Sequence, residues 1–336
     1  MEKAKLLQSK IDEIFGDDPV NLVGGSVRDI ILGKEPKDWD YCTPLEPDTI
    51  EQRIRDAGRK PYLTGKRFGT IGFKIATDSY PSQNPKDWVY VEVTTYRTEK
   101  YDGKSRKPTV DFTRDLMLDL SRRDFTINSI VLTKDGDYFD PHGGRLDIMA
   151  KKIKAVGNGK DRILEDPLRM LRAARFAARL GFEVDPNLIG VMKQYSSAIL
   201  RVSKERWIQE LDKLLESEHV EDGIEVLMRT DLMKYILPEV WLAFQDPICY
   251  ANTVEELKRM NENDEFLLDD KWGMLTYYIG FPYTKKVSGD KITFPGNREI
   301  RTELNAGISA RLKFSNDRAK ALSGVPVTEI RDVSEL

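Results

Sequence analysis

Two aspartates separated by one residue, Asp38 and Asp40, are the side chains in the N-terminal part of the chain best suited to chemistry. The surrounding residues predict a strand, and side chains two apart on a strand point to the same face. Two carboxylates so close together repel each other unless a cation lies between them. Mg²⁺ takes oxygen ligands and keeps substrate phosphates as co-ligands. The pair therefore predicts a site for a triphosphate and two divalent metals, with Asp38 and Asp40 as the metal ligands and catalytic residues.

A glycine turn precedes the aspartates. The apolar residues Val20, Leu22 and Val23 predict a short strand that Gly24 and Gly25 end, because glycine turns sharply and lets a ligand approach the backbone. Ser26 is expected to be the N-cap of a helix over residues 27–32. A helix N-terminus beside bare glycine backbone attracts phosphate oxygens. Arg28 either reaches those phosphates as well or pairs with Asp29.

A third carboxylate, Glu92, lies in a segment of alternating character. Val89, Val91 and Val93 occupy one face of the predicted strand 88–96, and Glu92 occupies the other. Glu92 is either a third member of the carboxylate site or a solvent-facing strand residue. The alternation alone leaves both interpretations open.

The composition is that of an ordinary soluble protein, and the length predicts two or more domains. The 336 residues are 40% hydrophobic and 32% charged, with a net charge of -3, so any nucleic-acid contact must come from local basic patches. Two cysteines exclude a disulfide framework and are typical of a reducing cytosol, so we expect a cytoplasmic protein without a membrane span. Two histidines are too few for a histidine-rich metal hydrolase site.

The secondary-structure pattern changes near residue 150. Strand signals dominate before it and helical periods after it, which indicates an α+β protein with a mixed sheet followed by helices. Residues 99–112 are predicted to be a mobile loop, and residues 122–130 an apolar, strand-like run. Residues 165–180 predict one strong helix that carries a stripe of arginines at positions 169, 172, 175 and 179.

Five segments in this order resemble the successive motifs of the class II tRNA nucleotidyltransferase and bacterial poly(A) polymerase family. They are Gly24-Gly25-Ser26-Val27-Arg28-Asp29, Asp38-Trp39-Asp40, Arg122-Arg123-Asp124-Phe125-Thr126-Ile127-Asn128, Glu165-Asp166-Pro167-Leu168-Arg169 and Ser203-Lys204-Glu205-Arg206. The resemblance spans roughly residues 20–215. It implies a polymerase beta-like catalytic head over residues 1–150 and helical neck, body and tail over residues 151–215, 216–280 and 281–336.

The resemblance also implies an activity and partners. The family adds C, C and A to the 3′ end of tRNA from CTP and ATP, without a nucleic-acid template and with Mg²⁺ in a two-metal mechanism. It implies that the tRNA acceptor stem and elbow are bound, the tail taking part, and it leaves the oligomeric state open. It favours Glu92 as part of the site. The nucleotide-binding residues that it implies are Gly24, Gly25, Ser26, Arg28, Arg123, Asp124, Asn128, Asp166, Arg169, Arg172 and Arg175.

The choice of base can be argued from hydrogen-bonding groups. Asp166 and Arg169, three apart on the predicted helix, share a face; an ionised Asp only accepts hydrogen bonds and an Arg only donates them. C and A each present an amino donor beside a ring-nitrogen acceptor, which this pair complements, whereas U and G present the reverse order. The alternative is a plain intrahelical salt bridge.

Three other functions remain open. A poly(A) polymerase and a CC-adding enzyme would share the fold. Residues 101–108 keep Asp102, Arg106 and Pro108 of a family loop that is needed for the switch to A, which favours the full CCA product. A non-catalytic RNA-binding relative would be favoured by loss of Asp38 or Asp40, and both are present.

Overall fold

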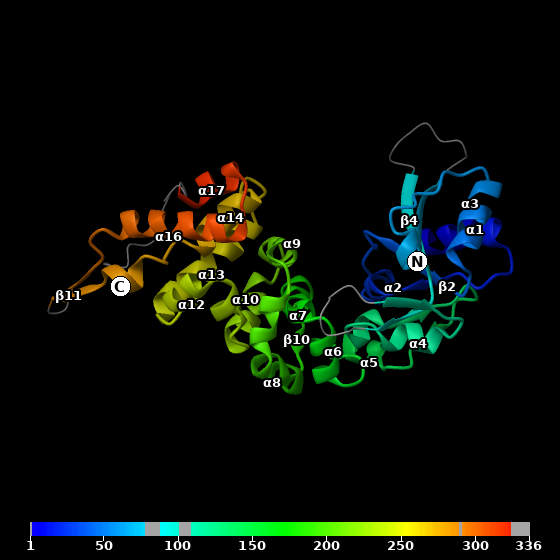
Figure 1. Ribbon diagram of the computed structural model, residues 1–336, viewed down its shortest axis with the longest axis horizontal. Coiled ribbons are helices and arrows are strands. Elements are labelled where there is room, and N and C mark those ends of the chain that lie inside the picture. Colours follow the sequence, from blue (N-terminus) through cyan, green and yellow to red (C-terminus); the bar gives the residue numbers. More distant parts are fainter. Residues whose placement is uncertain (1, 78–87, 101–108, 289–290, 324–336) are drawn as a thin grey trace. The chain divides into compact units, whose positions relative to one another are not determined.

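The computed structural model describes residues 2–77, 88–100, 109–288 and 291–323. The chain forms two compact units, Met1–Glu165 and Asp166–Leu336. The first contains a mixed sheet with helices and the second is built mainly from helices, which confirms the predicted α+β class (Figure 1). The finer division of the helical part into neck, body and tail stays a prediction.

A six-stranded sheet in the order β3-β4-β2-β1-β7-β8 forms the centre of the first unit. Strands β2 and β4 are parallel, and the other neighbours are antiparallel. The strands are β1 (Asn21–Val23), β2 (Trp39–Thr43), β3 (Thr70–Ala76), β4 (Trp88–Thr95), β7 (Val131–Leu132) and β8 (Tyr138–Phe139). The helices of this unit are α1 (Glu2–Phe15), α2 (Gly25–Ile31), α3 (Pro47–Asp56), α4 (Leu116–Ser121), α5 (Gly144–Met149) and α6 (Gly159–Glu165).

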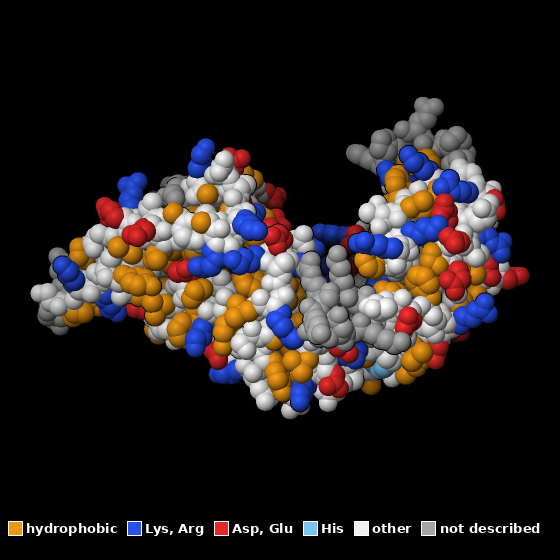
Figure 2. All heavy atoms as spheres, viewed as in Figure 1, with side chains coloured by type: hydrophobic (Ala, Val, Ile, Leu, Met, Phe, Trp, Pro, Cys, Tyr) orange, Lys and Arg blue, Asp and Glu red, His pale blue; other side chains and the backbone are white. Residues whose placement is uncertain are grey.

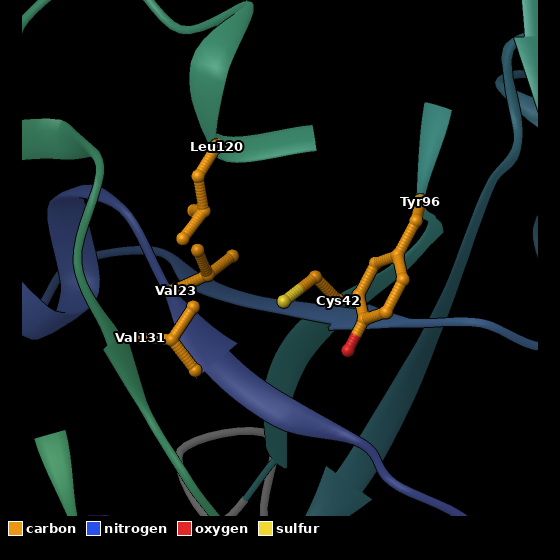
Figure 3. Packing of buried hydrophobic residues seen from close by; sticks show 5 residues of the cluster. All are labelled: Val23, Cys42, Tyr96, Leu120 and Val131. Atoms are coloured by element: carbon orange, nitrogen blue, oxygen red, sulfur yellow. The ribbon is translucent and has the colours of Figure 1, made fainter. Parts of the chain in front are cut away.

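The core of this unit follows from the alternation of its strands. Val91 and Val93 on β4 are fully buried, while Tyr90 is exposed, as the sequence pattern predicts. A cluster of Val23, Cys42, Tyr96, Leu120 and Val131 packs α4 against β1, β2 and β7 (Figure 3). This packing fixes β1 and β2 side by side, and these strands carry the residues of the glycine turn and the aspartate pair at their ends.

Two predictions for this unit are wrong in part. The predicted loop 99–112 begins and ends in strands, because β5 (Arg97–Lys100) pairs with β6 (Thr109–Phe112); residues 101–108 lie outside the described part. The run 122–130 is not a strand. It turns through the short helix η3 (Thr126–Asn128), because the Asp124 carboxylate accepts hydrogen bonds from the Phe125 N–H (2.8 Å) and the Asn128 amide (3.1 Å).

The predicted single helix over residues 165–180 is two helices. Helix α6 ends at Glu165 and α7 (Leu168–Leu180) begins two residues after Asp166. Proline lacks an N–H, and the residue before a proline disfavours helical backbone, so Pro167 separates the helices. Asp166 is therefore not on the helix face that the sequence predicts for it.

The second unit continues with helices and one small hairpin. Its further helices are α8 (Pro186–Gln194), α9 (Lys204–Leu215), α10 (Val220–Arg229), α11 (Leu232–Ile236), α12 (Pro238–Ala243), α13 (Pro247–Asn261), α14 (Leu268–Leu275), α15 (Phe281–Thr284), α16 (Asn297–Leu312) and α17 (Asn316–Ser323). Strands β11 (Lys286–Ser288) and β12 (Lys291–Thr293) pair antiparallel, which departs from a wholly helical remainder. Among the described residues, no helix combines the length and the apolar character needed to cross a bilayer.

A buried polar chain ties the glycine turn to the segment 124–128, a hundred residues further on. The Arg28 guanidinium, 2% exposed, donates to Asp29 Oδ1 (2.6 and 2.9 Å) and to Asn128 Oδ1 (2.6 Å). Asn128 in turn donates to Asp124 Oδ1 (3.1 Å). The pairing with Asp29 is thus confirmed. A contact between Arg28 and a phosphate stays a prediction.

Replacing Arg28 by alanine should destabilise the protein strongly, because it leaves the buried Asp29 carboxylate and the Asn128 amide without their donor. Breaking a buried ion pair from one side costs about 3–5 kcal/mol, and we expect a fall of that size in the free energy of unfolding, measured by urea denaturation. The matched control is Arg55→Ala, which removes an exposed pair with Glu51 (2.7 Å) and should leave the urea midpoint almost unchanged. Equal urea midpoints for the two variants would contradict the structural role of Arg28.

Candidate active site

Three carboxylates meet in one cavity of the first unit. Asp38, Asp40 and Glu92 line an open cavity of about 770 Å³ at the β2–β4 side of the sheet. Asp40 and Glu92 are direct neighbours in the parallel register of β2 and β4, and Asp38 directly precedes β2. Trp39, between the two aspartates, is 3% exposed and anchors the segment in the core. The structure thus brings Glu92 to the aspartate pair, which the sequence alone left open.

Asp40 is the carboxylate whose titration the site changes. The pKa of Asp40 is raised to about 6, mainly by burial and then by the negative charges of Glu92 and Asp38, while the Arg123 guanidinium acts in the opposite direction. Within the described ranges, no group of three or more His, Cys, Asp or Glu side chains is arranged to hold a metal ion by itself. A cation at Asp40 would therefore need ligands from outside the protein, as Mg²⁺ does when it keeps water and substrate phosphates.

Ser26 positions the aspartate pair, and the prediction that it caps a helix is wrong. Helix α2 begins at Gly25 with Gly24 as its N-cap, which makes no side-chain cap hydrogen bond. The Ser26 hydroxyl donates to the Asp38 carbonyl (2.9 Å) and accepts from the Asp40 N–H (3.1 Å). The hydroxyl therefore bridges the backbone on both sides of Trp39 and fixes the positions of the main-chain atoms from which the two carboxylate side chains extend.

Gly24 makes room for Arg123. Its φ of 76° favours glycine, and a Cβ at this position would lie 3.0 Å from Arg123 Nη1. Its N–H is committed to the Ile130 carbonyl (3.1 Å), so phosphate donors at this turn must come from the following amides. Arg123 itself donates to Asp119 Oδ2 (3.1 Å) and the Asn128 carbonyl (3.3 Å), and its buried Nε has no hydrogen-bond partner among the described residues.

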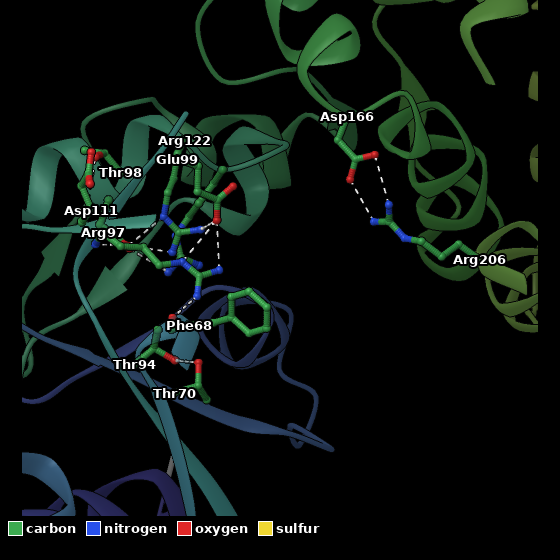
Figure 4. Close-up of polar contacts among 12 residues, drawn as sticks. Phe68, Thr70, Thr94, Arg97, Thr98, Glu99, Asp111, Arg122, Asp166 and Arg206 are labelled. Atoms are coloured by element: carbon green, nitrogen blue, oxygen red, sulfur yellow. Dashed lines mark hydrogen bonds and ion pairs between the residues drawn. The ribbon is translucent and has the colours of Figure 1, made fainter. Parts of the chain in front are cut away.

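The network behind Arg123 extends to the β5–β6 ribbon. Asp119, 1% exposed, accepts from Arg122 as well as Arg123 (2.7 and 3.1 Å). Arg122 also pairs with Glu99 (2.8 Å), which Arg97 contacts from the same strand (3.0 Å; Figure 4). These ion pairs hold the start of the ribbon against α4 and limit where Arg123 can move.

The remaining sequence-predicted residues lie in the second unit. Asp166 accepts a hydrogen bond from the Leu168 N–H (3.1 Å) and pairs with Arg206 of α9 (2.9 Å; Figure 4). The Arg169 N–H donates to the Asp166 carbonyl (3.0 Å), so the two residues stay one turn apart. The ion pair between Asp166 and Arg206 was not predicted from the sequence, although Arg206 was included in the Ser203–Arg206 motif.

The arginines of α7 differ in their surroundings. Arg169 and Arg175 are 6% and 7% exposed. Arg175 binds Glu210 of α9 (2.5 Å) and lies over the Phe176 ring at 4.1 Å, a buried contact that ties α7 to α9. Arg172, half-buried, lies 5.5 Å from the same ring. Figure 2 shows the lysine and arginine side chains of the second unit scattered among acidic and hydrophobic ones on the face in view.

Two family models match the chain in succession. Residues 20–154 match the poly A polymerase head domain, and residues 181–244 match a probable RNA- and SrmB-binding site of polymerase A. The first match includes Asp38, Asp40, Glu92 and Arg123. The second begins just after α7.

Curated relatives and solved structures agree with these models. A CCA-adding enzyme of Leuconostoc citreum is 38% identical over 225 residues, 66% of this chain and 52% of the relative. One of a Geobacillus species is 34% identical over 261 residues, 76% and 58% of the two chains. The chain thus spans just over half the length of these relatives.

The fold is also similar to solved structures. The crystal structure of the Bacillus stearothermophilus CCA-adding enzyme in complex with CTP gives a TM-score of 0.63 at 25% identity, over 96% of this chain and 75% of that one. The structure of an apo CCA-adding enzyme gives 0.67 at 22% identity, over 95% and 78%, which supports the fold. The chain therefore contains the head domain of the poly A polymerase family, followed by the probable RNA- and SrmB-binding region of such polymerases, and it is similar to CCA-adding enzymes.

Proposed function

We propose that this chain adds C, C and A to the 3′ end of tRNA from CTP and ATP without a nucleic-acid template. The observation that carries the proposal is the meeting of Asp38, Asp40 and Glu92 in one cavity, one strand away from the Gly24–Gly25 turn. This arrangement supplies a carboxylate centre beside a phosphate-binding turn, as nucleotidyl transfer requires. The names of the curated relatives supply the product.

The carboxylate centre fits divalent cations. Burial, and then the negative charges of Glu92 and Asp38, raise the pKa of Asp40 to about 6, so a positive charge bound beside the ionised carboxylates would stabilise the site. Asp38 and Asp40, with Glu92 beside them, would hold two such ions, and Mg²⁺ is the expected one. Bound there, the ions would make the primer hydroxyl more acidic and neutralise charge on the phosphates.

The protein's own residues orient the reactants. The backbone after Gly24 would bind the triphosphate. The Ser26 hydroxyl holds the backbone of the two aspartates in a fixed position beside this turn. Arg123, with an unpartnered Nε next to the site, would contact the ribose or a phosphate. Arg28, Asp124 and Asn128 are proposed to shape this wall of the nucleotide site through their hydrogen-bonded chain.

Base selection is assigned to Asp166 and Arg169, with Arg206 as a positioning residue. Arg206 holds the Asp166 carboxylate at 2.9 Å, so the acceptor that would meet the amino group of C or A has a fixed orientation. Arg172 and Arg175 are proposed to support the same nucleotide site from α7. The tRNA acceptor stem and elbow are the proposed partners of the helical unit, which contains the matched RNA-binding segment.

Two products of the same chemistry remain as alternatives, CC alone and poly(A). A non-catalytic RNA-binding role is less well supported, because a binding module has no need for a carboxylate centre that raises the pKa of Asp40.

The product distinguishes these functions directly. Three tRNAs that end before CCA, after C and after CC are each offered one labelled nucleoside triphosphate at a time. We expect incorporation of C, C and A respectively, and no extension beyond A. Incorporation that stops after CC, or that continues as a run of A, would replace the proposal by one of its alternatives.

Catalytic variants serve as the control for this assay. Asp38→Ala and Asp40→Ala should each reduce addition to background, because the cations lose a ligand, while tRNA binding measured by filter retention persists. Full activity in either variant would overturn the assignment of the carboxylates.

The raised pKa of Asp40 predicts a pH-dependent cost in stability. Its folded pKa of about 6 lies above the ordinary aspartate pKa of 3.8, so protonation stabilises the fold, fully below pH 4, and this contribution is lost as pH rises through 6. Asp40→Asn should therefore raise the free energy of unfolding of the EDTA-treated protein by about 3 kcal/mol at pH 7.5 but not at pH 4. Asp56→Asn on the exposed end of α3 is the control, and equal urea midpoints for Asp40→Asn and wild type at pH 7.5 would contradict the prediction.

Base choice should depend on Asp166 and, through it, on Arg206. Asp166→Ala should lower the preference for CTP over UTP by about 100-fold or more, because the acceptor for the amino group is gone. Arg206→Ala should lower this preference by less, because the carboxylate remains and keeps its hydrogen bond from the Leu168 N–H but loses its ion pair. The matched control is Arg311→Ala, which breaks a pair with Glu239 (2.6 Å) and should leave the CTP-to-UTP ratio unchanged. An Asp166→Ala enzyme that still used only CTP and ATP would refute the pairing.

A further inference from the structure

The order of the strands gives the carboxylate centre two distinct sides. Strand β2, which carries Asp40, lies between β1 and β4. On the β1 side the chain enters the Gly24–Gly25 turn, where the proposed function places the triphosphate. In an in-line displacement, the attacking oxygen and the leaving pyrophosphate lie on opposite sides of the transferred phosphorus. The 3′ end of an RNA primer must therefore approach from the β4 side.

Two exposed tyrosines lie on the β4 side. Tyr90 of β4 is 44% exposed, and Tyr62, which precedes β3, is 38% exposed. Their ring centroids are 5.8 Å apart with the planes tilted by 56°. Tyr90 lines the same cavity as Asp38, Asp40 and Glu92, and its hydroxyl donates to Glu92 Oε1 (3.3 Å). An aromatic surface thus adjoins the carboxylates directly.

Gly72 of β3 allows this position of the ring. It lies opposite Glu92 in the β3–β4 register, and a Cβ there would overlap the Tyr90 phenol. Without a side chain at residue 72, the Tyr90 ring can lie across the neighbouring strand. Lys74, exposed and opposite Tyr90 in the same register, adds a positive charge beside the rings.

We propose that Tyr90 and Tyr62 form a stacking platform for the 3′-terminal base of the RNA primer, with Lys74 facing its phosphate. The proposal rests on the proposed function. Stacking on an aromatic ring accepts every base, because every base has a π face. This tolerance fits a primer whose terminal base changes with each addition, whereas hydrogen-bonded recognition of one base would stall the reaction after the first step.

The test compares primer and nucleotide affinity in three full-length variants. Tyr90→Ala should raise KM for a tRNA that ends in C, and Kd for a short single-stranded RNA by fluorescence anisotropy, by about tenfold, and leave KM for CTP unchanged. Tyr90→Phe keeps the ring and should behave like wild type in all three measurements. The matched control is Phe139→Ala, because Phe139 is 40% exposed on β8, at the opposite edge of the same sheet, and should change none of them.

Each other result has a defined meaning. Unchanged primer KM and RNA Kd in Tyr90→Ala would overturn the platform. A Tyr90→Phe enzyme as impaired as Tyr90→Ala would also overturn it, because the hydroxyl on Glu92 would then matter and not the ring. If Tyr90→Ala fails to fold, Tyr62→Ala takes its place with the same expected direction. If the wild-type protein binds RNA through Tyr90 but adds no nucleotide, the proposed function fails and the platform stands.

Discussion

The burial of Asp40 beside two other carboxylates is the constraint on which the candidate site depends. Asp40 and Glu92 meet because β2 and β4 are parallel neighbours with these residues in register, and burial, with the negative charges of Glu92 and Asp38, raises the pKa of Asp40 to about 6, which is the cost of keeping this carboxylate ionised. A fold that tolerates this cost needs a rigid support. Trp39, buried between the aspartates, and Ser26, bonded to the backbone on both sides of it, supply that support.

A buried polar network lies behind the glycine turn, and its hydrogen bonds require particular side chains at each position. The Arg28 guanidinium donates hydrogen bonds to both Asp29 and Asn128. The Asn128 side chain donates to Asp124, and the Asn128 carbonyl accepts from Arg123. A buried network of this kind is costly when one member is missing, because each remaining group has lost its water without gaining a partner. The motif residues between 24 and 29 and between 122 and 128 therefore act largely on one another. Arg123, at the edge of the network, is the member with an unused buried donor.

Much of the fold could be predicted from local patterns. The alternation on β4 and the glycine turn after β1 each follow from chemistry within a few residues. The errors arise where distant partners decide. Ser26 was expected to cap α2, yet its hydroxyl is used by the backbone of Asp38 and Asp40, twelve to fourteen residues further along. Arg28 offered two interpretations, and only the position of Asn128 in space shows which contacts it makes.

The break at Asp166 shows the same rule in the second unit. A continuous apolar period from residue 165 to 180 favours one helix, but Pro167 ends the first helix and leaves Asp166 outside the second. This changes the physical basis of the proposed base selection. On a helix face, Asp166 would lie beside Arg169; outside it, the Asp166 carboxylate is held by the Leu168 N–H and by Arg206 of α9. In the function proposed above, discrimination between C and U would therefore rest on an ion pair between residues forty positions apart in the sequence, and the precision of that pair would limit how well the site distinguishes a donor on the base from an acceptor.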